Sequence, residues 1–352
     1  PLPSAATNLR QVPVPELTGI TNWINSEPLT LFELQGKVVL LDFWTYTCVN
    51  CIRTFPYLRE WHEKYIDSGL VIIGVHTPEF AFERSAENVE AAAMEHGLTY
   101  PIAQDNEYAS WQGFRVQAWP TKFILDQDGL LAHTNRGEGG YDQIEDIIRG
   151  LLEETGANLD GILPGVDPGP ERDPLASSSD IERTLTRELY GGFMRNIVQG
   201  GAYIQNEEYY DKINSDIEFT DPGLRRNNLM FLSGKWHNGS ESITHARQTE
   251  NYEDYLGVQF FANEVNAVMN IGSDTSYDVR LILDGEPMSE AIAGADVRFD
   301  EDGNSFVTVD EARMYRLVDS VQVESHELLL SSNSDAFSLN DFTFGAYRDS
   351  SN

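Results

Sequence analysis

Cys48 and Cys51 are the only two cysteines in a chain of 352 residues, and two residues separate them. The pair follows directly after residues 38–44, a continuous apolar run that predicts a buried strand. After the pair, apolar side chains recur at helical spacing to about residue 68, and Pro56 is expected to kink this helix. The sequence therefore predicts an α/β unit that presents two thiols at the turn from a strand into a helix.

Redox exchange is the favoured chemistry for this pair. A structural zinc site needs four ligands, but there is no second C-x-x-C and the seven histidines are scattered. An inert disulfide would close only a tiny loop and would stabilise the fold little. At the start of a helix, unpaired N–H groups stabilise a thiolate, so Cys48 is the predicted nucleophile. Cys51 lies one turn further on and is predicted to resolve a mixed disulfide.

Asp42 is a predicted proton relay. It lies within the apolar strand, where burial would raise the pKa of its carboxyl and let it exchange a proton with Cys51. The alternative is a carboxylate at a strand end, exposed to water.

The residues around the cysteines resemble the thioredoxin fold. The resemblance is carried by Asp42-Phe43-Trp44, the cysteine pair, Pro56 and Trp119-Pro120-Thr121. It implies that Pro120 is cis and faces the cysteines, and that the backbone beside it pairs with an extended substrate. The expected substrate-binding residues are Trp44, Trp119, Pro120 and Thr121.

The segment between Cys51 and Pro120 is longer than a minimal thioredoxin needs. It predicts strands over 70–76 and 100–103 and helices over 85–96 and 108–114. This extra unit resembles the TlpA and ResA branch of extracytoplasmic thiol-disulfide proteins. That resemblance implies an acidic residue near the active site, which makes Glu79 a second relay candidate; the alternative is a solvated loop glutamate.

Composition divides the chain into four parts. An N-terminal arm or tether over 1–25 precedes a thioredoxin-like domain over 26–155, which is expected to end with a β-hairpin around 124–132 and a helix over 141–154. Residues 156–174 are rich in proline and glycine and predict a linker. Residues 175–352 contain many short β-prone runs separated by turn residues, which predicts a β-sandwich or jelly roll.

The second half resembles the C-terminal domain of DipZ-type proteins. The matching segments are Leu232-Ser233-Gly234-Lys235-Trp236, residues 260–269, Leu283-Asp284-Gly285 and Asp341-Phe342-Thr343-Phe344-Gly345. The resemblance implies a carbohydrate-binding-module-like domain. It also implies a membrane electron-transfer partner of the CcdA type, as in cytochrome c biogenesis, and an extracytoplasmic, membrane-tethered setting.

Two ligand hypotheses follow for this half. Trp236, Tyr252 and Tyr255 are candidate contacts for a polysaccharide, although aromatic side chains in a sandwich are more often core. Residues 300–304 together with Glu311 contain the oxygen ligands of a structural Ca²⁺ site, but the spacing favours a hairpin turn. No metal or other cofactor is expected at the cysteines.

The net charge of −33 disfavours nucleic acid and anionic membrane as partners, and no apolar run is long enough to span a membrane.

The predicted function is a thiol-disulfide oxidoreductase that acts on disulfides of partner proteins. Val49 and Asn50 add no positive charge beside the thiolate, which favours a reductant. One alternative is a peroxiredoxin-like peroxidase, since Thr45 fits P-x-x-x-T-x-x-C, but Leu41 replaces the proline. The other is a carbohydrate-binding protein with a vestigial redox domain.

Overall fold

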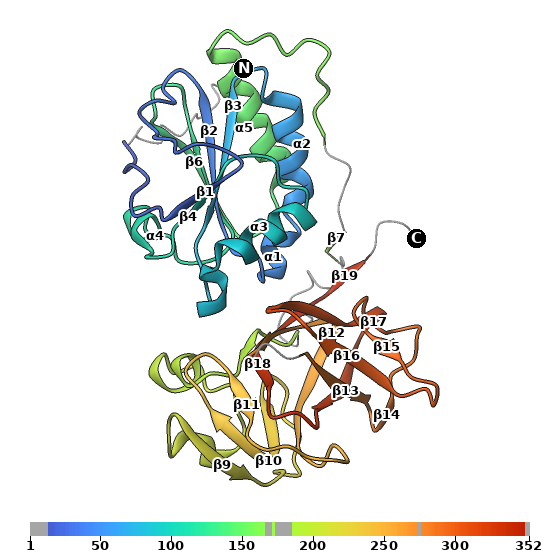
Figure 1. Cartoon of the computed structure of the whole chain (residues 1–352). Coiled ribbons are helices and arrows are strands. Elements are labelled where there is room, and N and C mark those ends of the chain that lie inside the picture. Colours follow the sequence, from blue (N-terminus) through green and yellow to red (C-terminus); the bar gives the residue numbers. More distant parts are fainter. Residues whose placement is uncertain (1–12, 166–170, 173–184, 273–275, 349–352) are drawn as a thin grey trace, which may run out of the picture. The chain divides into compact units, whose positions relative to one another are not determined.

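The computed structural model describes residues 13–165, 171–172, 185–272 and 276–348. The chain divides between Gly169 and Pro170 into two compact units. Each unit has a hydrophobic core of its own, so the positions of their elements can be given separately (Figure 1).

The first unit is built on a six-stranded mixed sheet in the order β1-β4-β3-β2-β5-β6. Parallel pairing joins β3 to both β2 and β4, whereas the other neighbours are antiparallel. The strands are β1 (Asn22–Ile24), β2 (Val38–Trp44), β3 (Leu70–His76), β4 (Ile102–Gln104), β5 (Thr121–Leu125) and β6 (Leu131–Arg136). This arrangement confirms the predicted α/β class.

Helices connect these strands. They are α1 (Val49–Ile52), α2 (Phe55–Tyr65), the 3₁₀-helix η1 (Ala81–Arg84), α3 (Ala86–Glu95), α4 (Ala109–Gly113) and α5 (Tyr141–Glu154). The single helix predicted after Cys48 is instead two helices, α1 and α2, with a break at Arg53 and Thr54. Pro56 lies in the first turn of α2, where its missing N–H removes no helical hydrogen bond.

Alternate side chains of β2 enter two different cores. Val38, Leu40 and Trp44 pack with apolar residues of α2, α3 and α5 and with Cys51. The side chains between them pack instead against Phe114 and the segment before β2. Because successive strand residues point to opposite faces, Asp42 lies on the face that carries the cysteines. Figure 1 shows α2 and α5 together beside the sheet.

The predicted boundaries at both ends of this unit need correction. Residues 13–25, the described part of the expected arm, belong to the domain, since β1 pairs with β4 and Leu17 packs against the sheet. The Glu16 carboxylate accepts hydrogen bonds from the amides of Leu31 and Phe32 at 2.7 and 3.2 Å. Leu159, in the expected linker, is buried in the core that contains Cys51. Residues 1–12 of the predicted arm and residues 166–170 and 173–174 of the predicted linker lie outside the described residues.

Strands dominate the second unit. The main sheet runs in the order β15-β16-β13-β17-β12-β10-β11-β18-β8, with β14 on β13 and β9 on β10. Its strands are β8 (Leu189–Tyr190), β9 (Ser215–Phe219), β10 (Met230–Asn238), β11 (Ile243–His245), β12 (Tyr255–Ile271), β13 (Tyr277–Leu283), β14 (Glu286–Pro287), β15 (Arg298–Phe299), β16 (Ser305–Val309), β17 (Arg313–Ser331) and β18 (Phe337–Gly345). A separate pair is formed by β7 (Glu171–Arg172) and β19 (Tyr347–Arg348). Two single turns, η2 (Met194–Val198) and η3 (Glu207–Tyr210), precede β9.

All pairings between these named strands are antiparallel, which confirms an all-β unit. The β-prone runs at 256–262 and 267–271 are parts of one long strand, β12, and those at 314–318 and 327–330 are parts of another, β17. The β12–β17 register shifts between Ala262 and Glu264 and again between Val265 and Asn266. Such bulges let a long strand bend, so polar residues that resemble a turn in sequence remain within the sheet.

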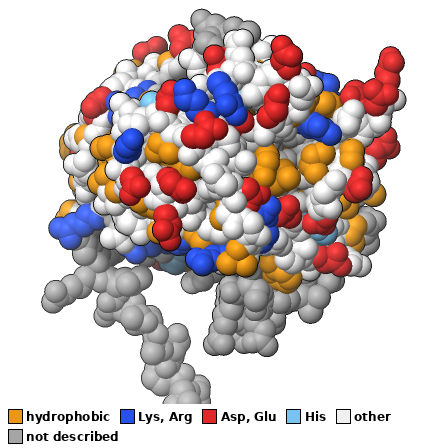
Figure 2. All heavy atoms as spheres, turned by 90° about the horizontal axis from the view of Figure 1, so that it is seen from below, with side chains coloured by type: hydrophobic (Ala, Val, Ile, Leu, Met, Phe, Trp, Pro, Cys, Tyr) orange, Lys and Arg blue, Asp and Glu red, His pale blue; other side chains and the backbone are white. Residues whose placement is uncertain are grey.

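Acidic side chains are spread over the molecular face in Figure 2, among basic and hydrophobic ones, and do not gather in one patch. None of the helices in the described parts of the chain is long and apolar enough to cross a membrane.

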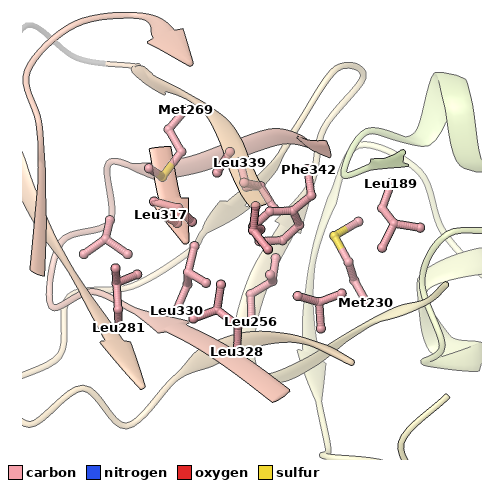
Figure 3. Packing of buried hydrophobic residues seen from close by; sticks show 14 of the residues in the cluster. Leu189, Met230, Leu256, Met269, Leu281, Leu317, Leu328, Leu330, Leu339 and Phe342 are labelled. Atoms are coloured by element: carbon pink, nitrogen blue, oxygen red, sulfur yellow. The ribbon is translucent and has the colours of Figure 1, made fainter. Parts of the chain in front are cut away.

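The core of the second unit is formed by strand residues from across the sheet. Figure 3 shows Met230, Leu256, Leu328 and Leu339 packed with residues of neighbouring strands. All four are fully buried. The finer description as a jelly roll stays a prediction.

Candidate active site

The cysteine pair lies where β2 ends and α1 begins. Cys48 is the N-cap of α1, and the backbone N–H of Cys51 donates a hydrogen bond to its Sγ at 3.2 Å. No disulfide joins the two residues. Cys48 is half-buried, whereas Cys51 is fully buried. The accessible sulfur is therefore the one predicted to attack, and the sheltered sulfur is the one predicted to resolve.

Asp42 is fully buried and faces a buried lysine. Its Oδ1 lies 3.0 Å from Nζ of Lys122, the cross-strand neighbour on β5. Neither group has a hydrogen bond of good geometry within the described parts of the chain, so the contact is an ion pair. Burial raises the pKa of the Asp42 carboxyl, and the positive charge of Lys122 opposes that rise. The exposed alternative for Asp42 is thus excluded, and the electrostatics suit a proton relay.

Tyr100 is buried in the core that contains Cys51. Burial raises the pKa of Tyr100 well above its usual value, and negative charge on Asp42 or Cys51 raises it further. Its hydroxyl is buried without a hydrogen-bond partner among the described residues. The Trp44 and Tyr100 rings both lie close to the backbone of β3 at Gly74. A Cβ on that residue would lie 2.8 Å from Trp44 Nε1 and 3.2 Å from the Tyr100 ring, so the position needs a glycine.

The peptide bond between Trp119 and Pro120 is cis, as predicted. Trp119 is half-buried, packs against the same core as Cys51, and donates from its Nε1 to the Thr77 carbonyl at 3.0 Å. The residue before Trp119, Ala118, is exposed.

Two of the predicted substrate contacts, Trp44 and Thr121, have buried side chains. Trp44 is fully buried and packs edge-on against Phe55 at 5.2 Å between ring centroids. Thr121 is also buried, and its hydroxyl donates to the Ala118 carbonyl at 2.7 Å. Trp44 lies on the face of the sheet that packs with Cys51, whereas Thr121 pairs with Phe43 and lies on the opposite face. Contact of these residues with a partner stays a prediction.

The buried carboxylate of the loop after β3 belongs to Glu83, not to Glu79. Glu83 is fully buried and accepts a hydrogen bond from the Thr47 hydroxyl at 2.6 Å, directly before Cys48. The half-buried Glu79 contributes a backbone N–H to the same carboxylate. Burial raises the pKa of the Glu83 carboxyl, whereas hydrogen bonds from Thr47, Phe80, Thr45 and Glu79 lower it.

His76 completes the buried polar group behind the loop. Its Nε2 lies 3.3 Å from the Thr45 hydroxyl, and its ring stacks on Tyr46 at 5.8 Å. Burial lowers the pKa of His76 to about 3, so the ring is neutral.

Sequence reasoning missed Tyr100, Glu83 and His76. A weak signal existed for Glu83, which is the third residue after Phe80, at the start of a helical turn. A glutamate at that spacing can accept the amide of the residue before the turn, as Glu83 accepts the Phe80 N–H at 2.9 Å. The burial of these three residues depends on packing of distant segments, which the sequence pattern does not contain.

The candidate glycan contacts lie in different environments. Trp236 is fully buried and donates to the Ser233 carbonyl at 2.9 Å, so it is a core residue. Tyr255 is half-buried, and its hydroxyl donates to Asp221 at 2.6 Å. The half-buried ring of Tyr252 lies beneath the guanidinium of Arg280 at 5.5 Å. The ring of Trp236 is therefore enclosed, whereas glycan contacts of Tyr252 and Tyr255 stay predictions.

The acidic loop at 300–304 is a hairpin turn between β15 and β16. Asp300 Oδ1 accepts the amides of Asp302 and Asn304 at 3.0 and 2.8 Å, so its carboxylate stabilises the turn itself. In the described parts of the chain, no cluster of three or more acidic, histidine or cysteine side chains could hold a metal ion.

Comparisons with known proteins divide the chain in the same way. Residues 11–134 match the AhpC/TSA family, and residues 186–345 match the family described as a thioredoxin like C-terminal domain. A solved thioredoxin-like protein in the oxidized form is 32% identical, with a TM-score of 0.38, and covers 40% of this chain and 95% of its own.

Curated relatives match one unit or both. The thiol-disulfide oxidoreductase YkuV of Bacillus subtilis is 34% identical over 148 residues, which is 42% of this chain and 98% of YkuV. ResA of Bacillus thuringiensis is 29% identical over 36% of this chain and 70% of ResA. Protein DipZ of Mycobacterium tuberculosis is 35% identical over 80% of this chain, but the chain spans only 38% of the length of DipZ.

A mixed α/β sheet, a cysteine pair at the end of its central strand and a cis-proline define a thioredoxin-like redox protein. The chain belongs to the family of thiol-disulfide oxidoreductases that includes YkuV, and it resembles DipZ through both of its units.

Proposed function

We propose that this protein is an extracytoplasmic reductant that transfers electrons from Cys48 and Cys51 to disulfides in partner proteins. The observation that carries the proposal is the asymmetry of the pair, with Cys48 half-buried and accepting the Cys51 N–H while Cys51 is enclosed. The similarity to DipZ and ResA supports the extracytoplasmic setting, and the resemblance to DipZ supports a membrane domain of the CcdA type as the electron donor.

The reaction has two exchange steps. The Cys48 thiolate attacks one sulfur of the partner disulfide, which forms a mixed disulfide and releases one partner thiolate. Cys51 then attacks the Cys48 sulfur, which releases the second partner thiolate and leaves a Cys48–Cys51 disulfide. Two electrons have passed to the partner. In this scheme Asp42 accepts the Cys51 proton as that sulfur attacks, because the buried carboxylate has a raised pKa and lies on the face of the sheet that packs with Cys51.

Insulin-disulfide reduction tests the activity. Cys48→Ser is expected to abolish reduction because the attacking sulfur is gone. Cys51→Ser is expected to stop turnover and to leave a covalent complex that dithiothreitol releases. Equal activity in both variants would contradict the assignment.

The equilibrium redox potential tests the direction of electron flow. A reductant is expected near the value of thioredoxin, about −270 mV, and not near that of the oxidant DsbA, about −120 mV. A value at the oxidising end would reverse the proposed direction. Rapid peroxide consumption by Cys51→Ser would instead favour the peroxidase alternative.

A further inference from the structure

Glu83 places a carboxylate beneath the loop that leads into Cys48. The loop residues Thr45 and Thr47 are buried, and both donate to this carboxylate from their hydroxyl groups. The Thr47 amide lies 3.4 Å from the same Oε1, and the Phe80 amide is 2.9 Å from Oε2. The carboxylate therefore joins two segments, the Cys48 loop and the turn after β3.

The loop in turn sets the position of the nucleophilic sulfur. The Cys48 amide donates to the Thr45 carbonyl at 3.4 Å, which closes a turn over the two residues between them. The Cys48 Sγ then accepts the Cys51 N–H at 3.2 Å. A shift of Thr45 or Thr47 would move Cys48 away from this donor, and a thiolate that loses a hydrogen bond is less stable.

His76 extends the connection to β3. Its neutral ring can donate from Nε2 to the Thr45 hydroxyl, which leaves the hydroxyl hydrogen for Glu83. A single chain of donors thus runs from His76 through Thr45 to the Glu83 carboxylate.

We propose that Glu83 is a positioning residue for Cys48, holding Thr45 and Thr47 so that the sulfur stays at the Cys51 amide. This inference rests on the proposed function only in taking Cys48 as the attacking thiol. Glu83 acts through Thr47 and does not itself react with the substrate.

The donor set explains why the residue is a glutamate. Two hydroxyl groups and the amides of Glu79 and Phe80 direct four hydrogens at its two oxygens, and the Thr47 amide lies further away, at 3.4 Å. An ionised carboxylate is acceptor-only and can receive about four such bonds. Glutamine has nearly the same shape, but its NH₂ group would oppose the donors on one side, so Glu83→Gln should loosen the loop without leaving a cavity.

Thiol reactivity provides the test. Thr47→Val, Glu83→Gln and the double variant are made in a Cys51→Ser background, so that iodoacetamide reports Cys48 alone. The matched control is Glu90→Gln, which removes an exposed carboxylate from α3. The rate of alkylation is measured against pH, and circular dichroism verifies folding.

Each single variant is expected to slow alkylation at neutral pH by about ten-fold, equivalent to raising the apparent thiol pKa by roughly one unit. The double variant should be no slower than the slower single one, because Glu83 acts through Thr47. The control should keep the parent profile.

Folded single variants with the parent pH profile, even at a lower melting temperature, would overturn the positioning role. Additive effects in the double variant would overturn it as well. Alkylation of Cys48 does not require turnover. A result against the positioning role of Glu83 is therefore distinct from a result against the proposed reductase activity, which insulin reduction measures separately.

Discussion

At the scale of single residues, the sulfur chemistry is supported by buried charge. The site contains Asp42, Lys122 and Glu83 as ionisable side chains with almost no exposure to solvent. Because burying charge is costly unless it is paired or hydrogen-bonded, each of these groups ties local stability to its partner.

The pair of Asp42 and Lys122 gives the first prediction. Lys122→Met should destabilise the protein by roughly 3–5 kcal/mol at about pH 8, because an unpaired carboxylate would remain buried. Burial raises the Asp42 pKa above 3.8, so the protonated carboxyl stabilises the fold in acid and this contribution is lost as the pH rises through the folded-state pKa. The deficit should therefore shrink at about pH 5.

Denaturant titrations at both pH values measure this effect. The double variant Asp42→Asn with Lys122→Met removes both charges and should recover most of the lost stability. A Lys122→Met protein as stable as its parent at the higher pH would show that the ion pair is not the source of the effect.

His76 gives a prediction with the opposite sign. Its pKa is lowered from 6.5 to about 3, so its neutral form contributes stability above pH 6.5 that is lost as the pH falls toward 3. His76→Phe and His76→Gln cannot take up this proton. Both should flatten the dependence of unfolding free energy on pH below 6.5, by up to about 1.4 kcal/mol per pH unit. Curves parallel to that of the parent would contradict the assignment.

At the scale of elements, backbone geometry limits what each strand can contain. Gly234, inside β10, has φ +89°, and a Cβ there would lie 2.1 Å from the carboxylate carbon of Asp254. Asp254 is buried and accepts hydrogen bonds from the Lys235 amide at 3.1 Å and from Arg247 Nε at 2.7 Å. Because Gly234 has no side chain, the Asp254 carboxylate has room to bind the Lys235 amide on β10 and the Arg247 side chain.

Gly234→Ala should therefore cost about 3–4 kcal/mol, from left-handed backbone strain together with displacement of Asp254. The matched control is Gly285→Ala, at φ +86° with nothing within 4 Å of the new Cβ, which should cost only about 1–2 kcal/mol. Urea unfolding compares the two. Equal losses would show that crowding at Asp254 does not matter.

Local patterns predicted those elements whose signals are continuous. The helix at 141–154 was found at both ends because its apolar side chains recur at helical spacing after a glycine-rich turn. The continuity of β12 and β17 was missed because Asn263 and Asp319 occur where a turn would be equally reasonable. At the site, the cysteines and Asp42 were recognised, whereas Glu83 and Tyr100 depend on contacts between segments far apart in sequence.

At the scale of the whole molecule, charge is the dominant feature. The sequence has 57 acidic and 24 basic residues, and Figure 2 shows acidic side chains distributed over the visible face. Like charges repel one another in the compact state, and salt screens this repulsion.

The melting temperature should consequently rise as sodium chloride increases from about 0.01 to about 0.5 M, since the Debye length falls from about 30 Å to a few ångströms. Differential scanning calorimetry measures the shift. Potassium chloride should act alike, because screening depends on ionic strength. A melting temperature that is constant or falls with salt would show that repulsion does not limit stability.

The three-way pairing of β12 has a practical consequence. This strand hydrogen-bonds with β10, β17 and β18 along its length. Cutting the chain there would deprive three neighbours of their partner at once. Opening the chain after Gly285 would instead separate β13 from the short β14 and leave Asp284 in place to hydrogen-bond with Glu327 and His326 of β17. New chain ends, affinity tags or fluorescent labels in this unit are best introduced at that turn.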